Sequence, residues 1–319
     1  MKQETSISPA PLRALPPQAR VAGWLAPDGW RHRRFDWRAD GAERGRLLFQ
    51  PGRSDVFEKY LDEIAELQAE GWSVTSFDWR GQGGSGRLGR DPRVGHADRF
   101  DAMVDDLAAF WRAWTAEGAG PRVLLGHSMG GHFALRALAD KVIDPDAVIL
   151  SAPMVQVRSP IGAWAGGVLA RLMLRRGEPT RSAWRWSTDP DSVARRRRRL
   201  TLDNSRGQDE RWWQVPNPEL ELGPPSWGWV VEAFRAGAVL ARHPGLERVT
   251  APVLMLVADG DKLVDPRAAR RVAERLPDCE LVRFAPNEAA HEVLREGDPA
   301  RGRAFAAIRS FLDRRVPRT

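Results

Sequence analysis

A serine between two glycines, placed directly after an apolar run, constrains this chain more than any other feature. Residues 123–125 form the apolar run, and the motif Gly-His-Ser-Met-Gly follows at 126–130. Helix-forming residues then continue to about Leu138. A strand-to-helix turn this tight leaves no room for side chains two positions before and after the serine, so Gly126 and Gly130 are required there. The pattern predicts that Ser128 lies in a strained turn at the edge of a sheet, with its hydroxyl exposed for attack.

A nucleophilic serine needs a base, and the base needs a carboxylate that orients it. With the serine on a strand-to-helix turn, the acid comes next in the chain and the histidine last. The sequence has six histidines. Three of them precede Ser128, His132 lies in the helix just after it, and His243 comes before any suitable acid. We therefore predict that His291, in a loop after the β-like run 281–284, is the base.

The acid should follow the apolar strand predicted over 252–257, and three aspartates lie there. Asp265 precedes a proline and is expected to cap the next helix. Asp259 is expected to fix the turn by bonding its own backbone. Asp261 lies just past the turn glycine and is best placed to reach His291. Asp261 is therefore the favoured acid, and Asp259 is the alternative.

Acyl transfer also needs N–H donors for the charge that develops on the carbonyl oxygen. One donor should be the backbone N–H of Met129, directly after the serine, and the other should come from a loop after an early strand. Residues 47–50 are typical of that strand, and Gly52 gives the following loop its freedom. The backbone N–H of Arg53 is the second candidate. The Arg53 guanidinium could meet an anionic group of a substrate, but we expect it to face solvent.

These segments resemble a known family. The resemblance is carried by residues 77–88, Gly95-His96, Arg99-Phe100, residues 105–107 and the serine motif. Together they look like bacterial lysophospholipases of the α/β-hydrolase superfamily, which are relatives of the monoacylglycerol lipases. The Pro-Gly-Arg loop at 51–53, with Tyr60 downstream, resembles the lysophospholipase branch, whereas monoacylglycerol lipases usually carry a His-Gly pair there. The resemblance covers roughly 45–155 and 245–315 and implies a serine hydrolase.

Strand-like and helix-like segments alternate outside the middle third of the chain. Repeated β-α units imply an α/β protein with a mainly parallel sheet covered on both faces, and the resemblance names it as the α/β-hydrolase fold. Residues 30–38 are expected in an antiparallel lead-in hairpin. We predict a loose N-terminal segment, an α/β core in two pieces and an inserted helical cap, or lid. Their bounds are 1–20, then 21–153 with 241–319, and 154–240.

The predicted cap holds seven of the 14 tryptophans in the chain. Tryptophan suits an apolar wall with a polar rim, but a helical subdomain could use the same rings as its own core. Residues 161–170 carry no charge and are followed by Arg171, Arg175 and Arg176. An interfacial lid helix has this pattern, and so does a buried cap helix. The arginine run 195–199 is typical of a solvated face, with a phosphate or anionic-lipid contact as the alternative.

Composition excludes several classes of protein. The formal net charge is +7, and only four of the 49 basic residues are lysine. Basicity could favour an anionic membrane surface, but the chain has no recognisable nucleic-acid-binding fold. The Gly-x-Gly-x-x-Gly pattern at 81–86 is followed by a loop and lacks the helix that a dinucleotide needs. Cys279 is the single cysteine and cannot form an internal disulfide.

No apolar run reaches the length of a membrane span, and the first 20 residues lack the apolar centre of a signal peptide. We therefore expect a cytoplasmic protein, with a peripheral position at the inner membrane face as a further option. Its predicted activity is hydrolysis of carboxylic esters through Ser128, His291 and Asp261, without metal or organic cofactor. Lysophospholipid is the favoured substrate, and monoacylglycerol or a generic ester is the alternative. A non-catalytic lipid-binding module is the alternative from another class.

Overall fold

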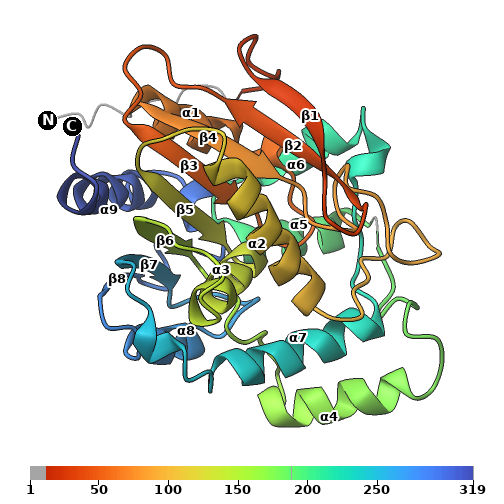
Figure 1. Ribbon diagram of the computed structural model, residues 1–319. Helices are drawn as coiled ribbons and strands as arrows, with labels where there is room; N and C mark the ends of the chain where they lie inside the picture. Colours follow the sequence, from red (N-terminus) through yellow and green to blue (C-terminus); the bar gives the residue numbers. More distant parts are fainter. Residues whose placement is uncertain (1–11, 188, 319) are drawn as a thin grey trace, which may run out of the picture.

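The computed structural model describes residues 12–187 and 189–318, and within them one eight-stranded sheet forms the centre of the molecule (Figure 1). Its order is β1-β2-β4-β3-β5-β6-β7-β8. The strands are β1 (Arg20–Leu25), β2 (Arg31–Trp37), β3 (Gly45–Gln50), β4 (Trp72–Phe77), β5 (Arg122–His127), β6 (Ala147–Ser151), β7 (Val253–Ala258) and β8 (Cys279–Phe284). β4 pairs with one side of β3, and β5 pairs with the other side. The later strands β6, β7 and β8 follow beyond β5, so the carboxyl end of β5 lies near the middle of the sheet.

Strand direction confirms the predicted fold class. β1 pairs with β2, and β2 with β4, in antiparallel fashion, which gives the lead-in hairpin expected around 30–38. From β4 to β8 every neighbouring pair is parallel. Buried apolar residues fill β5, β6 and β7, as expected for strands covered on both faces.

Two hydrophobic cores lie on opposite faces of the sheet because successive strand residues point to opposite sides. Leu48 belongs to the core that includes buried residues of α2, α3 and α8, and its neighbour Leu47 belongs to the core with α1 and α9. Figure 1 shows these helices on either side of the sheet. The helices of the two faces are α1 (Leu61–Ala69), α2 (Asp101–Thr115), α3 (Met129–Ala139), α8 (Pro266–Ala273) and α9 (Ala300–Arg315).

A long insertion separates β6 from β7. It contains α4 (Ala163–Leu174), α5 (Pro190–Leu200), η2 (Arg206–Gln208), α6 (Asp209–Gln214), η3 (Pro218–Leu220) and α7 (Trp227–Leu240). α7 lies between the core and α4, which forms the lower edge of the molecule in Figure 1. Buried residues of α7, such as Ala233 and Leu240, join the core that includes α2 and α3. The close α4–α7 packing requires small residues, because a Cβ on Gly166 would lie 2.8 Å from Phe234.

Burial in the insertion decides between two of the predicted alternatives. Trp164 of α4 is 83% exposed, and Trp184, Trp186 and Trp212 are exposed as well. Most tryptophans of the insertion therefore do not form a core of their own. α4 buries only Gly166, Gly167 and Ala170, so the interpretation of this segment as a buried cap helix is wrong.

The predicted loose N-terminal segment falls partly outside the described residues, which begin at Leu12. Residues 12–19 form no helix or strand, but they are attached to the rest of the molecule. The Leu12 N–H donates to Asp62 at 2.8 Å, and Arg13 pairs with Asp209 at 2.8 Å. Among the described residues, no helix is both long enough and apolar enough to cross a bilayer.

Candidate active site

Ser128 lies in the strand-to-helix turn that the sequence predicts. It follows β5 and precedes α3, with φ 51° and ψ −113°, a conformation that non-glycine residues rarely adopt. A Cβ on Gly126 would come within 2.9 Å of the Gly131 backbone, across the turn. A Cβ on Gly130 would come within 2.7 Å of the Pro51 carbonyl, in the loop after β3. Both glycines are sterically required, Gly126 by the turn itself and Gly130 by the end of β3 and the loop that follows it.

The structure brings the three predicted site residues together at the carboxyl edge of the sheet. Ser128 follows β5, Asp261 follows β7 and His291 follows β8. The Ser128 Oγ lies 2.8 Å from His291 Nε2, and His291 Nδ1 lies 2.6 Å from Asp261 Oδ2. All three side chains are buried. They form a continuous hydrogen-bonded line across residues up to 163 positions apart in the chain.

Asp261 is fixed on both oxygens. Its Oδ2 faces the His291 ring, while its Oδ1 accepts the backbone N–H groups of Leu263 and Val264 at 2.7 and 3.1 Å. Asp261 therefore makes the turn that was expected of Asp259. The Asp259 carboxylate instead pairs with Arg270 and Arg283, each at 2.6 Å, so its predicted role in the turn is wrong.

The third aspartate, Asp265, caps a helix as expected. Its side chain accepts the Arg267 N–H at the start of α8, and Pro266 occupies the first helical position. This arrangement leaves Asp265 engaged with the backbone of α8. Of the three aspartates, Asp261 is the one hydrogen-bonded to His291.

Charges around His291 control its protonation. Burial disfavours the imidazolium, but the neighbouring Asp261 carboxylate outweighs this effect and raises the pKa of His291 above its ordinary value. The ring of His127 lies 4.9 Å from that of His291. Burial, and the charge that His291 can carry, lower the pKa of His127 to about 4. His127 therefore stays neutral at the pH values where His291 titrates.

The loop after β3 lies directly over Ser128. A Cβ on Gly52 would be 3.1 Å from the Ser128 Cβ, so only glycine allows this approach. The Gly52 N–H donates to Asp55, and the Ser54 N–H donates to Gln82 at 2.7 Å. These bonds fix the backbone on both sides of Arg53. The loop is therefore held where the sequence predicts the second donor for the carbonyl oxygen.

The Arg53 side chain does not face solvent, and that prediction is wrong. Its Nη2 donates to the Gly223 carbonyl at 2.7 Å, and its guanidinium lies over the Trp229 ring at 5.2 Å. Both partners belong to the insertion, which therefore covers this part of the loop. Sequence reasoning missed the contact because the two segments are 170 residues apart.

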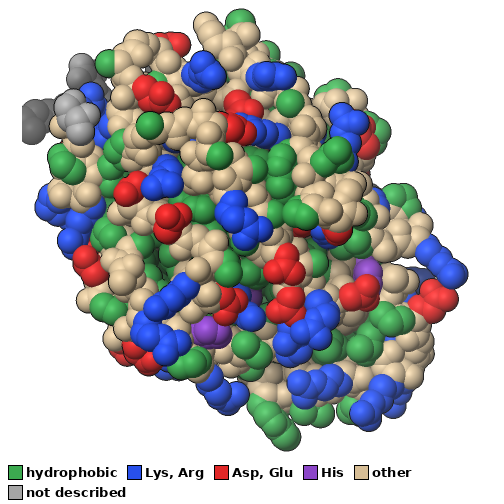
Figure 2. All heavy atoms as spheres, in the orientation of Figure 1, with side chains coloured by type: hydrophobic (Ala, Val, Ile, Leu, Met, Phe, Trp, Pro, Cys, Tyr) green, Lys and Arg blue, Asp and Glu red, His purple; other side chains and the backbone are tan. Residues whose placement is uncertain are grey.

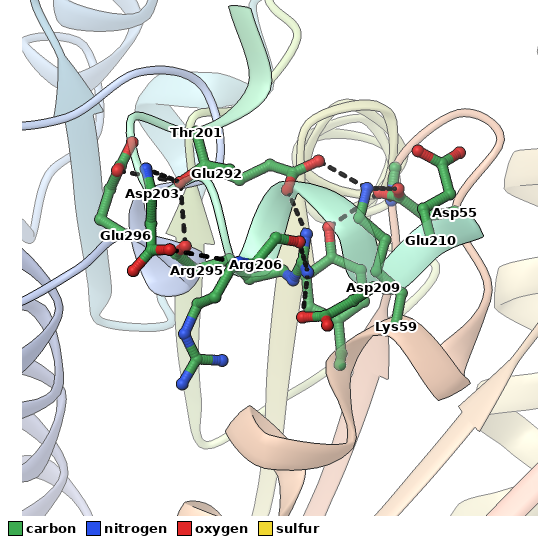
Figure 3. A network of polar contacts seen from close by, with 12 residues as sticks. Asp55, Lys59, Thr201, Asp203, Arg206, Asp209, Glu210, Glu292, Arg295 and Glu296 are labelled. Atoms are coloured by element: carbon green, nitrogen blue, oxygen red, sulfur yellow. Dashed lines mark hydrogen bonds and ion pairs between the residues drawn. The ribbon is translucent and has the colours of Figure 1, made fainter. Parts of the chain in front are cut away.

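A buried ionic network supports the loops on either side of the site (Figure 3). Lys59 Nζ lies 2.6 Å from Asp55, in the loop over Ser128, and 2.5 Å from Glu292, which follows His291 directly. Arg295 pairs with Glu292 at 2.5 Å and with Asp209 of α6 at 2.8 Å. Burial favours the neutral acid, but Lys59 and Arg295 hold the pKa of Glu292 well below its usual range. The network joins the loop after β3, the segment after β8 that carries His291, and the insertion.

The insertion also forms hydrogen bonds with the segment after β8 that carries His291. The Glu292 N–H donates to the Leu200 carbonyl at 2.7 Å, and Thr201 Oγ1 lies 2.9 Å from Glu296. Sequence reasoning missed all of these contacts. The available signal was a set of charged residues adjacent to the predicted site residues, above all Glu292 next to His291.

The glycine-rich segment 81–86 is a turn, as expected. The Gly84 N–H donates to Asp78 at 2.8 Å, and the next helix of the fold, α2, begins only at Asp101. Arg80 braces α2 through Asp106 at 2.6 Å. No cluster of three or more potential metal-ligating side chains occurs in the part of the chain that the structure describes.

A strained serine turn on a mainly parallel sheet, with an insertion after β6, is the arrangement of the α/β-hydrolase fold. Residues 41–298 match the family Hydrolase_4, described as serine aminopeptidase, S33, and the chain belongs to this family. It is also 32% identical over 290 residues to lysophospholipase L2 of Escherichia coli strain K12, covering 84% of this chain and 80% of that protein. The probable lysophospholipase L2 of Haemophilus influenzae is 28% identical, with coverage of 86% and 85%.

Two solved structures show the same fold. A soluble variant of monoglyceride lipase from Saccharomyces cerevisiae, in complex with a substrate analogue, aligns with a TM-score of 0.76 at 20% identity, covering 97% of this chain and 99% of that chain. The monoacylglycerol lipase of Paleococcus ferrophilus aligns with a TM-score of 0.65 at 23% identity, covering 90% and 99%. Family and relatives together place this chain among the esterase- and lipase-type hydrolases.

Proposed function

We propose that this protein is a serine hydrolase that cleaves the carboxylic ester of a lysophospholipid. The proposal rests on one observation, the buried line from Ser128 Oγ through His291 to Asp261, with separations of 2.8 and 2.6 Å. A histidine within hydrogen-bond reach of a serine and oriented by a carboxylate is what nucleophilic catalysis requires.

In this mechanism the Ser128 Oγ attacks the ester carbonyl while His291 Nε2 takes the hydroxyl proton. Asp261 holds the imidazole in the tautomer with its proton on Nδ1 and stabilises the imidazolium that forms. The N–H groups of Met129 and Arg53 donate to the negative carbonyl oxygen. The imidazolium then gives its proton to the departing alcohol, and a fatty-acyl ester on Ser128 remains. Water, deprotonated by His291, hydrolyses this ester and restores the serine.

Lysophospholipid is the proposed substrate because the curated relatives with 32% and 28% identity are named as lysophospholipases. Monoacylglycerol and simple esters are the alternatives, since solved structures with the same fold are lipases and esterases. We place residues 154–240 as a cap over the site, on the strength of the contacts that Gly223 and Trp229 make with Arg53.

Covalent labelling tests the proposal. A fluorophosphonate probe should label the wild-type protein and fail to label Ser128→Ala. Turnover of lysophosphatidylcholine, monoacylglycerol and p-nitrophenyl esters of increasing chain length then ranks the substrates. A folded wild-type protein that takes no label and cleaves none of these esters would favour the non-catalytic lipid-binding module instead.

We also propose that α4 docks on an anionic membrane surface. Ile161, Trp164, Leu169 and Leu172 are exposed, and Arg171, Arg175 and Arg176 flank them without an acidic partner among the described residues. Figure 2 shows apolar and basic side chains next to each other along this lower edge. Apolar side chains beside unpaired arginines fit a bilayer of anionic lipid. Trp164→Ala should reduce co-sedimentation with vesicles containing phosphatidylglycerol, and unchanged binding would contradict the docking.

A further inference from the structure

Arg53 is half-buried and, unlike Arg33 and Arg295, has no carboxylate partner among the described residues. Arg33 pairs with Glu58 at 2.7 Å, and Arg295 pairs with Glu292. Within the described part of the chain, the Arg53 guanidinium donates to two uncharged acceptors, the Gly223 carbonyl at 2.7 Å and Ser54 Oγ at 3.3 Å. Its Nε is buried with no hydrogen-bond partner in the described part of the chain. The positive charge is therefore partly buried, and no direct ion pair with a described residue neutralises it.

Removing part of a charged group from water without an ion pair costs free energy, so the retention of Arg53 needs a reason. Burial lowers the pKa of Arg53 to about 10, and the acidic groups of Glu210 and Asp55 oppose this effect only in part. A guanidinium remains charged at neutral pH even so. Contact with the Trp229 ring contributes attraction but no negative charge.

The position of Arg53 connects this charge with the reaction. Gly52, the preceding residue, approaches Ser128 closely enough that a Cβ there would lie 3.1 Å from the serine Cβ. On the other side, Arg53 Nη2 reaches the insertion at Gly223 and lies beside Gly95. The guanidinium thus lies between the loop over the nucleophile and the segment of the insertion that covers it.

We propose that the Arg53 side chain binds the phosphodiester of a lysophospholipid substrate, in place of the Gly223 carbonyl that it holds when the site is empty. A phosphate oxygen would supply the negative charge that the carbonyl lacks, and Nε together with Nη2 would form the two-pronged contact that guanidinium makes with phosphate. This inference rests on the proposed function and names the group that selects its substrate.

The two contacts of Arg53 agree with the shape of such a lipid. In a lysophospholipid the glycerol backbone separates the ester carbonyl from the phosphate, a span comparable to an extended arginine side chain. The Arg53 backbone N–H would donate to the carbonyl oxygen while its guanidinium meets the phosphate. A monoacylglycerol has the same ester and glycerol but no phosphate, so it leaves the guanidinium uncompensated.

The test compares two substrates with the same acyl chain, 1-acyl-lysophosphatidylcholine and 1-monoacylglycerol, in the full-length protein. For Arg53→Met, we expect the ratio of kcat/KM for the first substrate to that for the second to fall by about 10- to 100-fold, the size of a lost hydrogen bond to a charged group. Arg53→Lys should restore part of the ratio. A loss of activity that affects both substrates equally cancels in this ratio, because both substrates react with the same Ser128.

Arg87→Met is the matched control. Arg87 also binds insertion carbonyls, those of Glu219 and Glu221, but it lies outside the loop over Ser128. Its substitution weakens the same contact between core and insertion, and it should leave the ratio unchanged. A ratio that falls equally in Arg87→Met would overturn the inference, because the effect would then come from the position of the insertion.

A second readout uses sn-glycero-3-phosphocholine as an inhibitor of p-nitrophenyl butyrate hydrolysis. It should compete in the wild-type protein and compete at least tenfold more weakly in Arg53→Met. An unchanged ratio and unchanged inhibition in Arg53→Met would overturn the inference while ester hydrolysis stands. A wild-type protein that cleaves monoacylglycerol but not lysophosphatidylcholine would also overturn it. Absence of all ester hydrolysis would instead remove the proposed function on which it rests.

Discussion

The carboxyl edge of the sheet and α4, at the lower edge of the molecule in Figure 1, use charge in opposite ways. Around His291 the buried charges are paired, as in the Lys59–Glu292 contact at 2.5 Å. In α4 and the turn after it, by contrast, Arg171, Arg175 and Arg176 have no acidic partner among the described residues, and Trp164 is exposed. Paired charges hold a fixed geometry, whereas unpaired charges and exposed rings are available to a ligand or a surface. The fixed geometry suits the chemistry that we propose for the edge, and the exposed groups of α4 suit its proposed contact with a membrane.

The largest effect on turnover is expected at the carboxyl edge of the sheet, where the charges are paired. Asp261→Asn keeps the shape of the side chain but removes the charge that orients His291, so we expect turnover to fall by about 10⁴-fold with the fold retained. Steady-state kinetics and circular dichroism measure the two quantities. Asp259→Asn is the control, because Asp259 pairs with Arg270 and Arg283 away from the ring. Comparable losses in both variants would remove Asp261 from its assigned role.

Loss of a buried network charge should chiefly affect stability. Lys59→Met leaves Asp55 and Glu292 without their shared cation, and removal of one partner of a buried pair costs about 3–5 kcal/mol. Urea denaturation measures the free energy of unfolding. Arg314→Met, which removes a surface pair with Glu280, should cost at most about 1 kcal/mol. If the two losses were alike, the network would not differ energetically from a surface ion pair.

The pH dependence of the reaction should report the raised pKa of His291. The base works only when neutral, so kcat/KM should fall as the pH drops through a value above about 6.5, the ordinary histidine value. Asp261, Asp55 and Glu292 all favour the imidazolium. Glu292→Gln removes one of these charges and should move the acidic limb to lower pH by up to about one unit.

Glu288→Gln is the control for this pH effect, since Glu288 is exposed and pairs with Arg303. The pH profile of kcat/KM for Glu288→Gln should have the same acidic limb as that of the wild-type protein. A shift of the Glu292→Gln limb to higher pH would show that the sign assigned to this charge is wrong.

The smallest effect contrasts two glycines. Gly167 of α4 has room for a methyl group, because its Cβ would lie 3.5 Å from Phe234, and Gly167→Ala should stabilise the protein by about 0.5–1 kcal/mol. Gly130→Ala should instead impair both folding and activity, since its Cβ would meet the backbone carbonyls of Gln50 and Pro51. Thermal denaturation compares them. Equal tolerance at both sites would mean that the serine turn is less tightly packed than described.

The sequence predicted those features that lie in local patterns. Ser128, His291 and the aspartates at 259 and 261 each follow a recognisable strand, and parallel strands bring their carboxyl ends to one edge. Chain order therefore predicted where the side chains meet, and the position of Asp261 after the turn glycine favoured it over Asp259. The fate of the Arg53 side chain could not be predicted, because its surroundings come from Gly223 and Trp229 in a segment without a motif.

The buried network was missed for a related reason. Lys59 and Glu292 lie 233 residues apart, and charged residues in a helical pattern are normally assigned to a solvated face. Asp259 and Asp261 illustrate the same limit on a smaller scale. Both could form the turn, and the choice depended on Arg270 and Arg283, which give Asp259 other partners.

Mass spectrometry of protein quenched with acid during turnover of lysophosphatidylcholine tests the central claim most directly. If Ser128 Oγ is the nucleophile, the peptide that carries Ser128 should gain the mass of one fatty-acyl group. The adduct should be absent from Ser128→Ala, together with the activity. Steady hydrolysis with no acyl group on that peptide, and with activity retained in Ser128→Ala, would contradict the account.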